Sequence, residues 1–168
     1  MLTYIRLSSL SRNVLQIAAL SGSRESSPMQ QGLPAGTRAP EFSLINTRGK
    51  AVSLKDFIGQ KILLMFSSPT CPFCIQLYAD LKLLQEQNPD VQIVMISEGS
   101  IEENKKLASE QGFSFPVLDW QDSVAIDYRV TGTPSFYVID EEGIIVSSGW
   151  ASDLRGLKKL LETPGLNQ

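Results

Sequence analysis

Cys71-Pro72-Phe73-Cys74 contains both cysteines of this 168-residue chain and stands between two strong sequence patterns. Residues 61–66, Lys-Ile-Leu-Leu-Met-Phe, form a nearly continuous apolar run, which is typical of a buried central strand. Residues 72–87 repeat apolar side chains at helical spacing, and Asn88-Pro89 ends that pattern. Two cysteines separated by two residues at a strand-to-helix corner predict a thiol–disulfide redox site.

The place of each cysteine in this corner predicts its role. Pro72 suits the first position of a helix, where a backbone N–H is not needed, so Cys71 becomes the N-cap residue. Its sulfur can then accept a hydrogen bond from the N–H of Phe73 or Cys74 at the positive end of the helix dipole. Because both effects favour the thiolate, we expect Cys71 to be the nucleophile. Cys74, one turn further on the apolar face, is expected to resolve the mixed disulfide.

Three other interpretations of the cysteine pair stay open: a zinc half-site, an inert structural disulfide and a chance pair of core cysteines. Zinc needs two further ligands, and the chain has no other cysteine and no histidine. A disulfide that closes so short a loop adds little stability, whereas cysteine is also an ordinary small core residue. We expect redox chemistry with no metal and no cofactor.

Composition excludes several classes of function. The absence of histidine removes histidine-based acid–base catalysis and Ser-His triads. The net charge is −3 with scattered lysines and arginines, so we expect no nucleic-acid partner. No apolar run reaches the length of about 18 residues that a transmembrane helix requires, so none is expected.

The order of the elements predicts one α/β domain over residues 36–163, followed by a short tail at 164–168. Strand patterns alternate with helix patterns, which is typical of β-α-β units. A hairpin with Gly49 in its turn precedes them, and a short helix is expected to begin at Ser53. The expected strands are 41–45, 50–53, 62–66, 91–96, 135–139 and 144–148, and the expected helices are 72–87, 101–111, 122–128 and 154–161.

Residues 1–35 differ from the domain in composition and pattern. Residues 4–20 have the spacing of an amphipathic helix, and residues 21–36, rich in Ser, Gly, Pro and Gln, are interpreted as a flexible linker. We expect the domain to fold without them, and the helix offers a weak membrane or partner contact. The sequence does not identify the compartment; because the apolar stretch at 14–20 is short for a signal peptide, it slightly favours the cytoplasm over the cell envelope. We expect a monomer.

Gly132-Thr133-Pro134 leads directly into the strand expected at 135–139. The simplest interpretation is a proline that begins a strand. The alternative is a cis Thr133–Pro134 bond, which would turn the backbone of Thr133 towards the thiols and leave it free to pair with an extended substrate. Thr133, Pro134, Pro72 and Phe73 are therefore the candidate substrate-binding residues, with Phe73 exposed. Both tryptophans, Trp120 and Trp150, are expected to pack in the interior.

These motifs together resemble the thioredoxin-like superfamily, and the additional hairpin at 39–54 resembles its redoxin, or AhpC/TSA-type, branch. The segment Ser68-Pro69-Thr70-Cys71-Pro72 is similar to thioredoxin-like maturation proteins of the methylamine dehydrogenase accessory and cytochrome c maturation types. The resemblance covers most of the chain. It implies a three-layer α/β/α sandwich with a mixed central sheet of four to five strands and an N-terminal β-hairpin extension.

The resemblance implies a thiol–disulfide oxidoreductase in redox homeostasis, acting on protein disulfides or dithiols with an electron donor that the sequence does not identify. Two alternatives stay open: a peroxiredoxin-like, antioxidant thiol peroxidase, and a non-enzymatic redox-sensing or interaction module. By the same resemblance, a peroxidase would have a threonine three residues before its reactive cysteine and an arginine just before the matching strand. If Cys74 were that cysteine, Cys71 would stand in place of the threonine and Pro134 in place of the arginine. Arg129, in the preceding loop, is the remaining candidate for that arginine.

The chain also departs from the thioredoxin pattern around its cysteines. Met65 stands where thioredoxins bury an aspartate, and Leu77 stands where cytochrome-maturation members often carry a glutamate. Thr70 replaces the usual tryptophan before the first cysteine. No buried carboxylate is therefore evident as a proton acceptor for Cys74, and water or Glu98 is the expected route.

Overall fold

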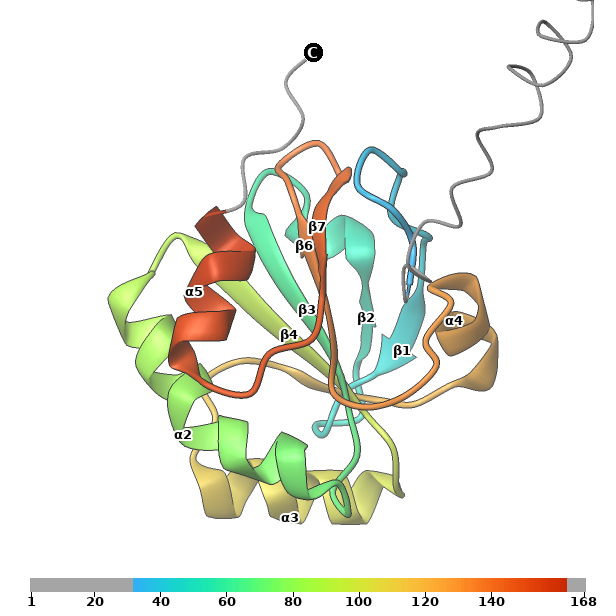
Figure 1. Ribbon diagram of the computed structural model, residues 1–168. Helices are drawn as coiled ribbons and strands as arrows, with labels where there is room; N and C mark the ends of the chain where they lie inside the picture. Colours follow the sequence, from blue (N-terminus) through green and yellow to red (C-terminus); the bar gives the residue numbers. More distant parts are fainter. Residues whose placement is uncertain (1–31, 163–168) are drawn as a thin grey trace, which may run out of the picture. The chain divides into compact units, whose positions relative to one another are not determined.

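The computed structural model describes residues 32–162, and its centre is a five-stranded mixed sheet (Figure 1). The strand order is β5-β4-β3-β6-β7, in which β3, β4 and β5 run parallel while β6 and β7 pair antiparallel. A separate two-stranded hairpin precedes the sheet. The strands are β1 (Ser43–Ile45), β2 (Ala51–Ser53), β3 (Lys61–Ser67), β4 (Val91–Ser97), β5 (Val117–Asp119), β6 (Ser135–Ile139) and β7 (Ile145–Gly149).

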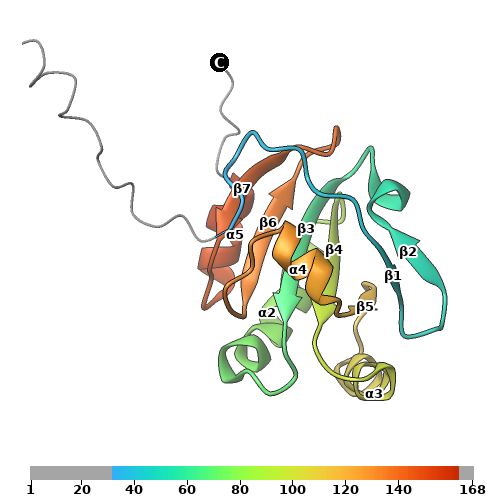
Figure 2. The ribbon, with the colours of Figure 1, turned by 90° about the vertical axis from the view of Figure 1, so that its right-hand side faces the viewer.

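Helices cover both faces of this sheet, so the domain is the expected three-layer α/β/α sandwich with a β-hairpin extension. Helices α2, α3 and α5 pack against one face, whereas α4 and the hairpin pack against the other (Figures 1 and 2). The helical elements are η1 (Leu54–Phe57), α2 (Pro72–Gln87), α3 (Ile101–Gln111), α4 (Asp122–Asp127) and α5 (Leu154–Glu162).

Strand β3 lies in the middle of the sheet and is buried on both sides, which explains its apolar sequence. Leu63 and Met65 contribute to the core under α2 and α5. Leu64 and Phe66 contribute to the core on the opposite face, where the rings of Tyr128 and Tyr137 surround Phe66. The strand therefore anchors both layers and carries the chain to the cysteines at its C-terminal end.

Most element boundaries follow the predicted ones. Asp56 accepts a hydrogen bond from the backbone N–H of Ser53 at 2.8 Å, which begins η1 where the helix was expected. α3 ends at Gly112, which has φ +63. β5 was missed, because three residues after Pro116 give no periodicity and their strand conformation comes from pairing with β4.

The N-terminal edge of the packed domain lies earlier than residue 36. Leu33 is only 6% exposed and belongs to the core on the α4 face. Its carbonyl accepts a hydrogen bond from Ser148 Oγ at 3.0 Å, which ties it to β7. Residues 32–35 are thus part of the domain rather than of a linker, and the helix expected at 4–20 lies outside the described residues.

A helix that spans a membrane needs both sufficient length, about 20 residues, and a predominantly apolar sequence. None between residues 32 and 162 meets both requirements.

Candidate active site

The two cysteines lie where the C-terminal end of β3 turns into α2, and both are free thiols. Cys71 is the N-cap residue of α2 with Pro72 at the first helical position, and its backbone is extended (φ −83, ψ 113). The N–H of Cys74 donates a hydrogen bond to Cys71 Sγ at 3.2 Å. Cys71 is partly exposed, whereas Cys74 is fully buried under the first turn of the helix. Only the Cys71 sulfur is therefore open to a substrate.

The loop before β6 forms the opposite side of the site. The Thr133–Pro134 peptide bond is cis. The Cys71 thiol donates to the carbonyl of Thr133 at an Sγ–O distance of 3.5 Å. Pro134 is buried, and Ser135 of β6 is aligned with Phe66 of β3, next to the cysteine corner. The structure thus brings together Cys71, Cys74, Thr133 and Pro134, which are about 60 residues apart in the sequence.

The surroundings of the two thiols move their pKa values in opposite directions. For Cys71, burial raises the pKa. Hydrogen bonds from the side chains of Cys74 and Thr133, and from the backbone N–H groups of Cys74 and Phe73, outweigh this effect, so the pKa is lowered overall. For Cys74, burial and the hydrogen bond with Cys71 raise the pKa to about 11. An outer thiol that ionises more readily than the inner thiol is the arrangement that a nucleophile and a resolving thiol require.

Carboxylates contribute nothing to the immediate surroundings of Cys74 in the described structure. Met65 and Leu77, which stand where the resemblance led us to expect acids, are both fully buried in the apolar core. Glu98, considered as an alternative proton acceptor, is exposed. The polar groups that act on Cys74 are those of Cys71, Thr133, Ser67 and the backbone of Ser68.

Two exposed aromatic rings lie beside Cys71. Phe73 is 53% exposed, and the edge of its ring meets Trp150, 54% exposed, at a centroid distance of 6.1 Å. The expectation that Trp150 packs in the interior is therefore wrong, because the residue follows β7 at its exposed end rather than lying within the strand. Trp120 does pack, with its ring against Phe66 at 5.7 Å.

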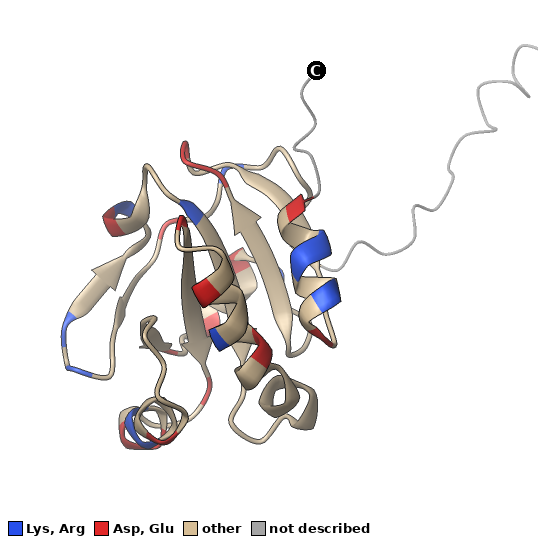
Figure 3. Cartoon of the chain, turned by 90° about the vertical axis from the view of Figure 1, so that its left-hand side faces the viewer, with Lys and Arg blue, Asp and Glu red and all other residues tan. Residues whose placement is uncertain are grey.

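Three segments carry the cysteines, the cis proline and Trp150: residues 67–79, 130–135 and 147–152. None of the three contains Lys, Arg, Asp or Glu. Figure 3 shows the charged residues elsewhere, for example along α5. The side chains that these segments provide around Cys71 are therefore uncharged, whether apolar or polar.

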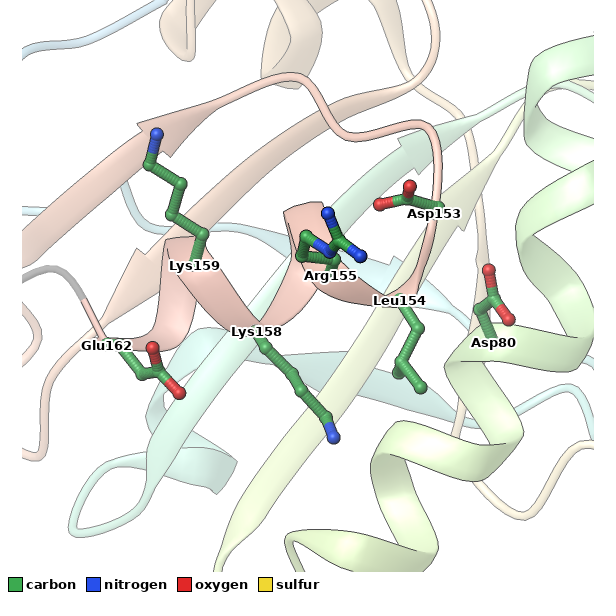
Figure 4. Close-up of a pocket in the computed structure, with 7 residues that line it drawn as sticks. All are labelled: Asp80, Asp153, Leu154, Arg155, Lys158, Lys159 and Glu162. Atoms are coloured by element: carbon green, nitrogen blue, oxygen red, sulfur yellow. The ribbon is translucent and has the colours of Figure 1, made fainter.

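A separate pocket lies between α2 and α5, away from the thiols (Figure 4). Asp80 contributes to it from α2, and the remaining lining residues come from α5 and the turn before it. Neither cysteine, Thr133 nor Pro134 lines this pocket. It therefore has no part in the thiol chemistry.

Comparisons with known proteins agree with this geometry. The profile of the AhpC/TSA family matches residues 35–148. Thioredoxin-like protein YneN of Bacillus subtilis (strain 168) is 32% identical over 124 residues, which cover 71% of this chain and 73% of that protein. Methylamine utilization protein MauD of Paracoccus denitrificans is 32% identical over 146 residues, which cover 82% and 72%.

Among solved structures, the thioredoxin domain of a thiol-disulfide oxidoreductase from Bacteroides vulgatus is similar to this chain with a TM-score of 0.67 and 27% identity. The likeness covers 76% of this chain and 96% of that domain. The fold is thus thioredoxin-like.

Proposed function

The chain belongs to the AhpC/TSA family and has a thioredoxin-like fold, and from this premise we propose that it is a thiol–disulfide oxidoreductase acting on protein substrates through Cys71 and Cys74. The observation that carries the proposal is the asymmetry of the pair. Cys71 is accessible and has a lowered pKa, whereas Cys74 is buried with a raised pKa and lies one helical turn away. Relatives described as thiol-disulfide oxidoreductases support this kind of redox enzyme.

The proposed reaction proceeds in two exchange steps. The Cys71 thiolate attacks one sulfur of a substrate disulfide, forms a mixed disulfide and releases the other substrate sulfur as a thiol after protonation. Cys74 then attacks Cys71 Sγ, which closes the Cys71–Cys74 disulfide and releases the second substrate thiol. Two electrons pass from the protein to the substrate. An external dithiol must reduce the pair before the next cycle, and with an oxidised pair the same steps run in reverse.

The surface beside Cys71 favours substrates with uncharged residues around their cysteine. Phe73 and Trp150 provide an aromatic contact, and no charged residue lies in the surrounding segments. Thr133 offers its backbone next to the sulfur that forms the mixed disulfide. We infer that a substrate segment binds in an extended conformation, with an apolar side chain placed on the Phe73–Trp150 pair.

The experiment that tests this proposal is the trapping of mixed disulfides in two matched variants. Cys74→Ser keeps the nucleophile and removes the resolving thiol, so covalent complexes with substrate proteins should accumulate and disappear on treatment with dithiothreitol. Cys71→Ser removes the nucleophile and should trap nothing. Complexes held by Cys71→Ser instead would reverse the two roles, and none in either variant would favour a redox-sensing module.

A peroxidase function has less support from the same site. Arg129, the arginine nearest in sequence to the cis-proline loop, is exposed and makes no hydrogen bond or ion pair with Cys71 or Thr133 in the described structure. Among the described residues, Cys71 therefore lacks a contacting arginine that would polarise the O–O bond of a peroxide. The disulfide exchange reaction needs no such arginine.

A further inference from the structure

Two buried hydroxyl groups near Cys74 have no hydrogen-bond partner within residues 32–162: Ser67 Oγ and the phenol of Tyr78. Ser67 is the last residue of β3 and is fully buried. Tyr78 is one helical turn beyond Cys74 on the same buried face of α2, and its ring packs edge-on against Phe113. Buried hydroxyls without partners cost stability, so their presence beside a reactive thiol requires an explanation.

The chemistry of Cys74 supplies one. To resolve a mixed disulfide, this fully buried thiol must become a thiolate where burial opposes the charge. In this chain no carboxylate among the described residues serves that role: Met65 and Leu77 are apolar and buried, and Glu98 is exposed. The site must therefore stabilise the anion with neutral donors.

We propose that Ser67 and Tyr78 form a hydroxyl pair that stabilises the Cys74 thiolate during resolution, with Tyr78 donating to Ser67 Oγ and Ser67 donating to Cys74 Sγ. Burial raises the pKa of both the Cys74 thiol and the Tyr78 phenol, and the Ser67 hydroxyl opposes that rise at both groups, so it lies within reach of each. In the dithiol state there is no anion at Cys74, so the two hydroxyls have no strong acceptor to bind. They are positioning residues, since they act through Cys74.

This role of Ser67 and Tyr78 rests on the proposed function, and the resolution step that it assists consumes no net proton or electron. Cys74 loses its proton and attacks Cys71 Sγ, the Cys71–Cys74 bond forms and the bond from Cys71 to the substrate sulfur breaks. The departing sulfur takes up one proton, so substrate thiol leaves and no base is consumed. Both hydroxyls keep their own protons throughout.

The test separates the two thiols by stopped-flow reaction of the reduced protein with the aromatic disulfide DTNB. The first release of the coloured thiolate depends on the DTNB concentration and reports Cys71. The second release is independent of it and reports the attack of Cys74 on the mixed disulfide.

The pH profile of the second phase is compared among wild type, Ser67→Ala, Tyr78→Phe and the control Ser97→Ala. Ser97 is equally buried, lies opposite Ser67 in β4 and donates to the Glu98 carbonyl instead.

We expect Ser67→Ala to move the midpoint of the second phase up by about one pH unit. The thiolate population at pH 7 then falls about tenfold while the intrinsic nucleophilicity rises about threefold, so the second phase slows about threefold. Tyr78→Phe should also raise the midpoint and slow the second phase, whereas Ser97→Ala should change neither the midpoint nor the rate. The first phase should stay unchanged in all three variants.

Each remaining outcome has a definite meaning. Second-phase profiles of Ser67→Ala and Tyr78→Phe that coincide with wild type overturn the hydroxyl pair and leave the proposed function intact. A wild-type protein without any second phase overturns the proposed function and the inference with it. A melting temperature of Ser67→Ala at or above that of wild type, together with a slower second phase, is the combination that only the proposed role predicts.

Discussion

Titration of Cys74 should make the reduced protein less stable at alkaline pH, and this effect can be isolated. The perturbation is Cys74→Ala, made in a Cys71→Ser background so that no disulfide forms and one thiol remains to titrate. Burial raises the pKa of Cys74 from its ordinary value of 9.0 to about 11 in the folded chain. Because the folded state prefers the protonated thiol, Cys74 contributes its full share to the free energy of unfolding below pH 9. This contribution is lost as the pH rises towards 11.

The magnitude follows from the pKa. A rise of about two pH units corresponds to ~2.7 kcal/mol of stability lost across that window. The Cys71→Ser background removes the contribution of the neighbouring thiol and leaves burial, the larger cause. The expected loss is therefore between about 1 and about 3 kcal/mol.

Urea unfolding at several pH values between 7.5 and 10.5, followed by tryptophan fluorescence, measures this difference. Groups distant from Cys74 titrate alike in the single and the double variant, so their contributions cancel when the two unfolding free energies are subtracted. The pKa of Tyr78, raised mainly by burial, also depends on Cys74, so its change forms part of the measured difference. The difference in unfolding free energy in favour of the variant that retains Cys74 should decrease steadily as the pH rises. A difference that stays flat, or grows with pH, would refute the account of Cys74 as a buried thiol held in its protonated form.

Three further predictions concern the edge of the domain, the substrate surface and peroxide. A chain that starts at residue 36 loses Leu33 and should be about 2 kcal/mol less stable than one that starts at 31; equal melting temperatures would contradict this. Phe73→Ala and Trp150→Ala should raise the KM for insulin reduction several-fold without changing the DTNB reaction of Cys71, whereas an unchanged KM would remove them from substrate binding. Hydrogen peroxide should oxidise Cys71 at the rate of an ordinary low-pKa thiol by stopped-flow fluorescence; a rate many orders of magnitude higher would indicate a peroxidase.

The parts of the fold that were predicted well carry their signals locally. α2 has the predicted bounds because Pro72 begins it, Asn88-Pro89 ends it, and the apolar face between them keeps helical spacing. The cysteine corner is part of the same local pattern. The order of such segments predicted β-α-β units, and the resemblance to thioredoxin-like proteins implied the sandwich and the mixed sheet that the structure has.

The parts that were missed depend on contacts between distant segments. β5 exists through its pairing with β4, and Leu33 is buried because β7 and the adjacent core receive it. Its neighbours Gly32 and Pro34 read as linker, and composition cannot report such docking. The exposed position of Trp150 and the burial of the Ser67 hydroxyl are likewise tertiary properties, invisible to a local pattern.

Equilibration of the protein with glutathione buffers of stepped potential tests the central claim most directly. The fraction of oxidised protein would be read by mass after alkylation of free thiols. We expect one reversible two-electron transition to a species with a Cys71–Cys74 disulfide, with a midpoint between about −270 and about −120 mV. A protein that forms only glutathione adducts, or no intramolecular disulfide at any potential, would contradict it.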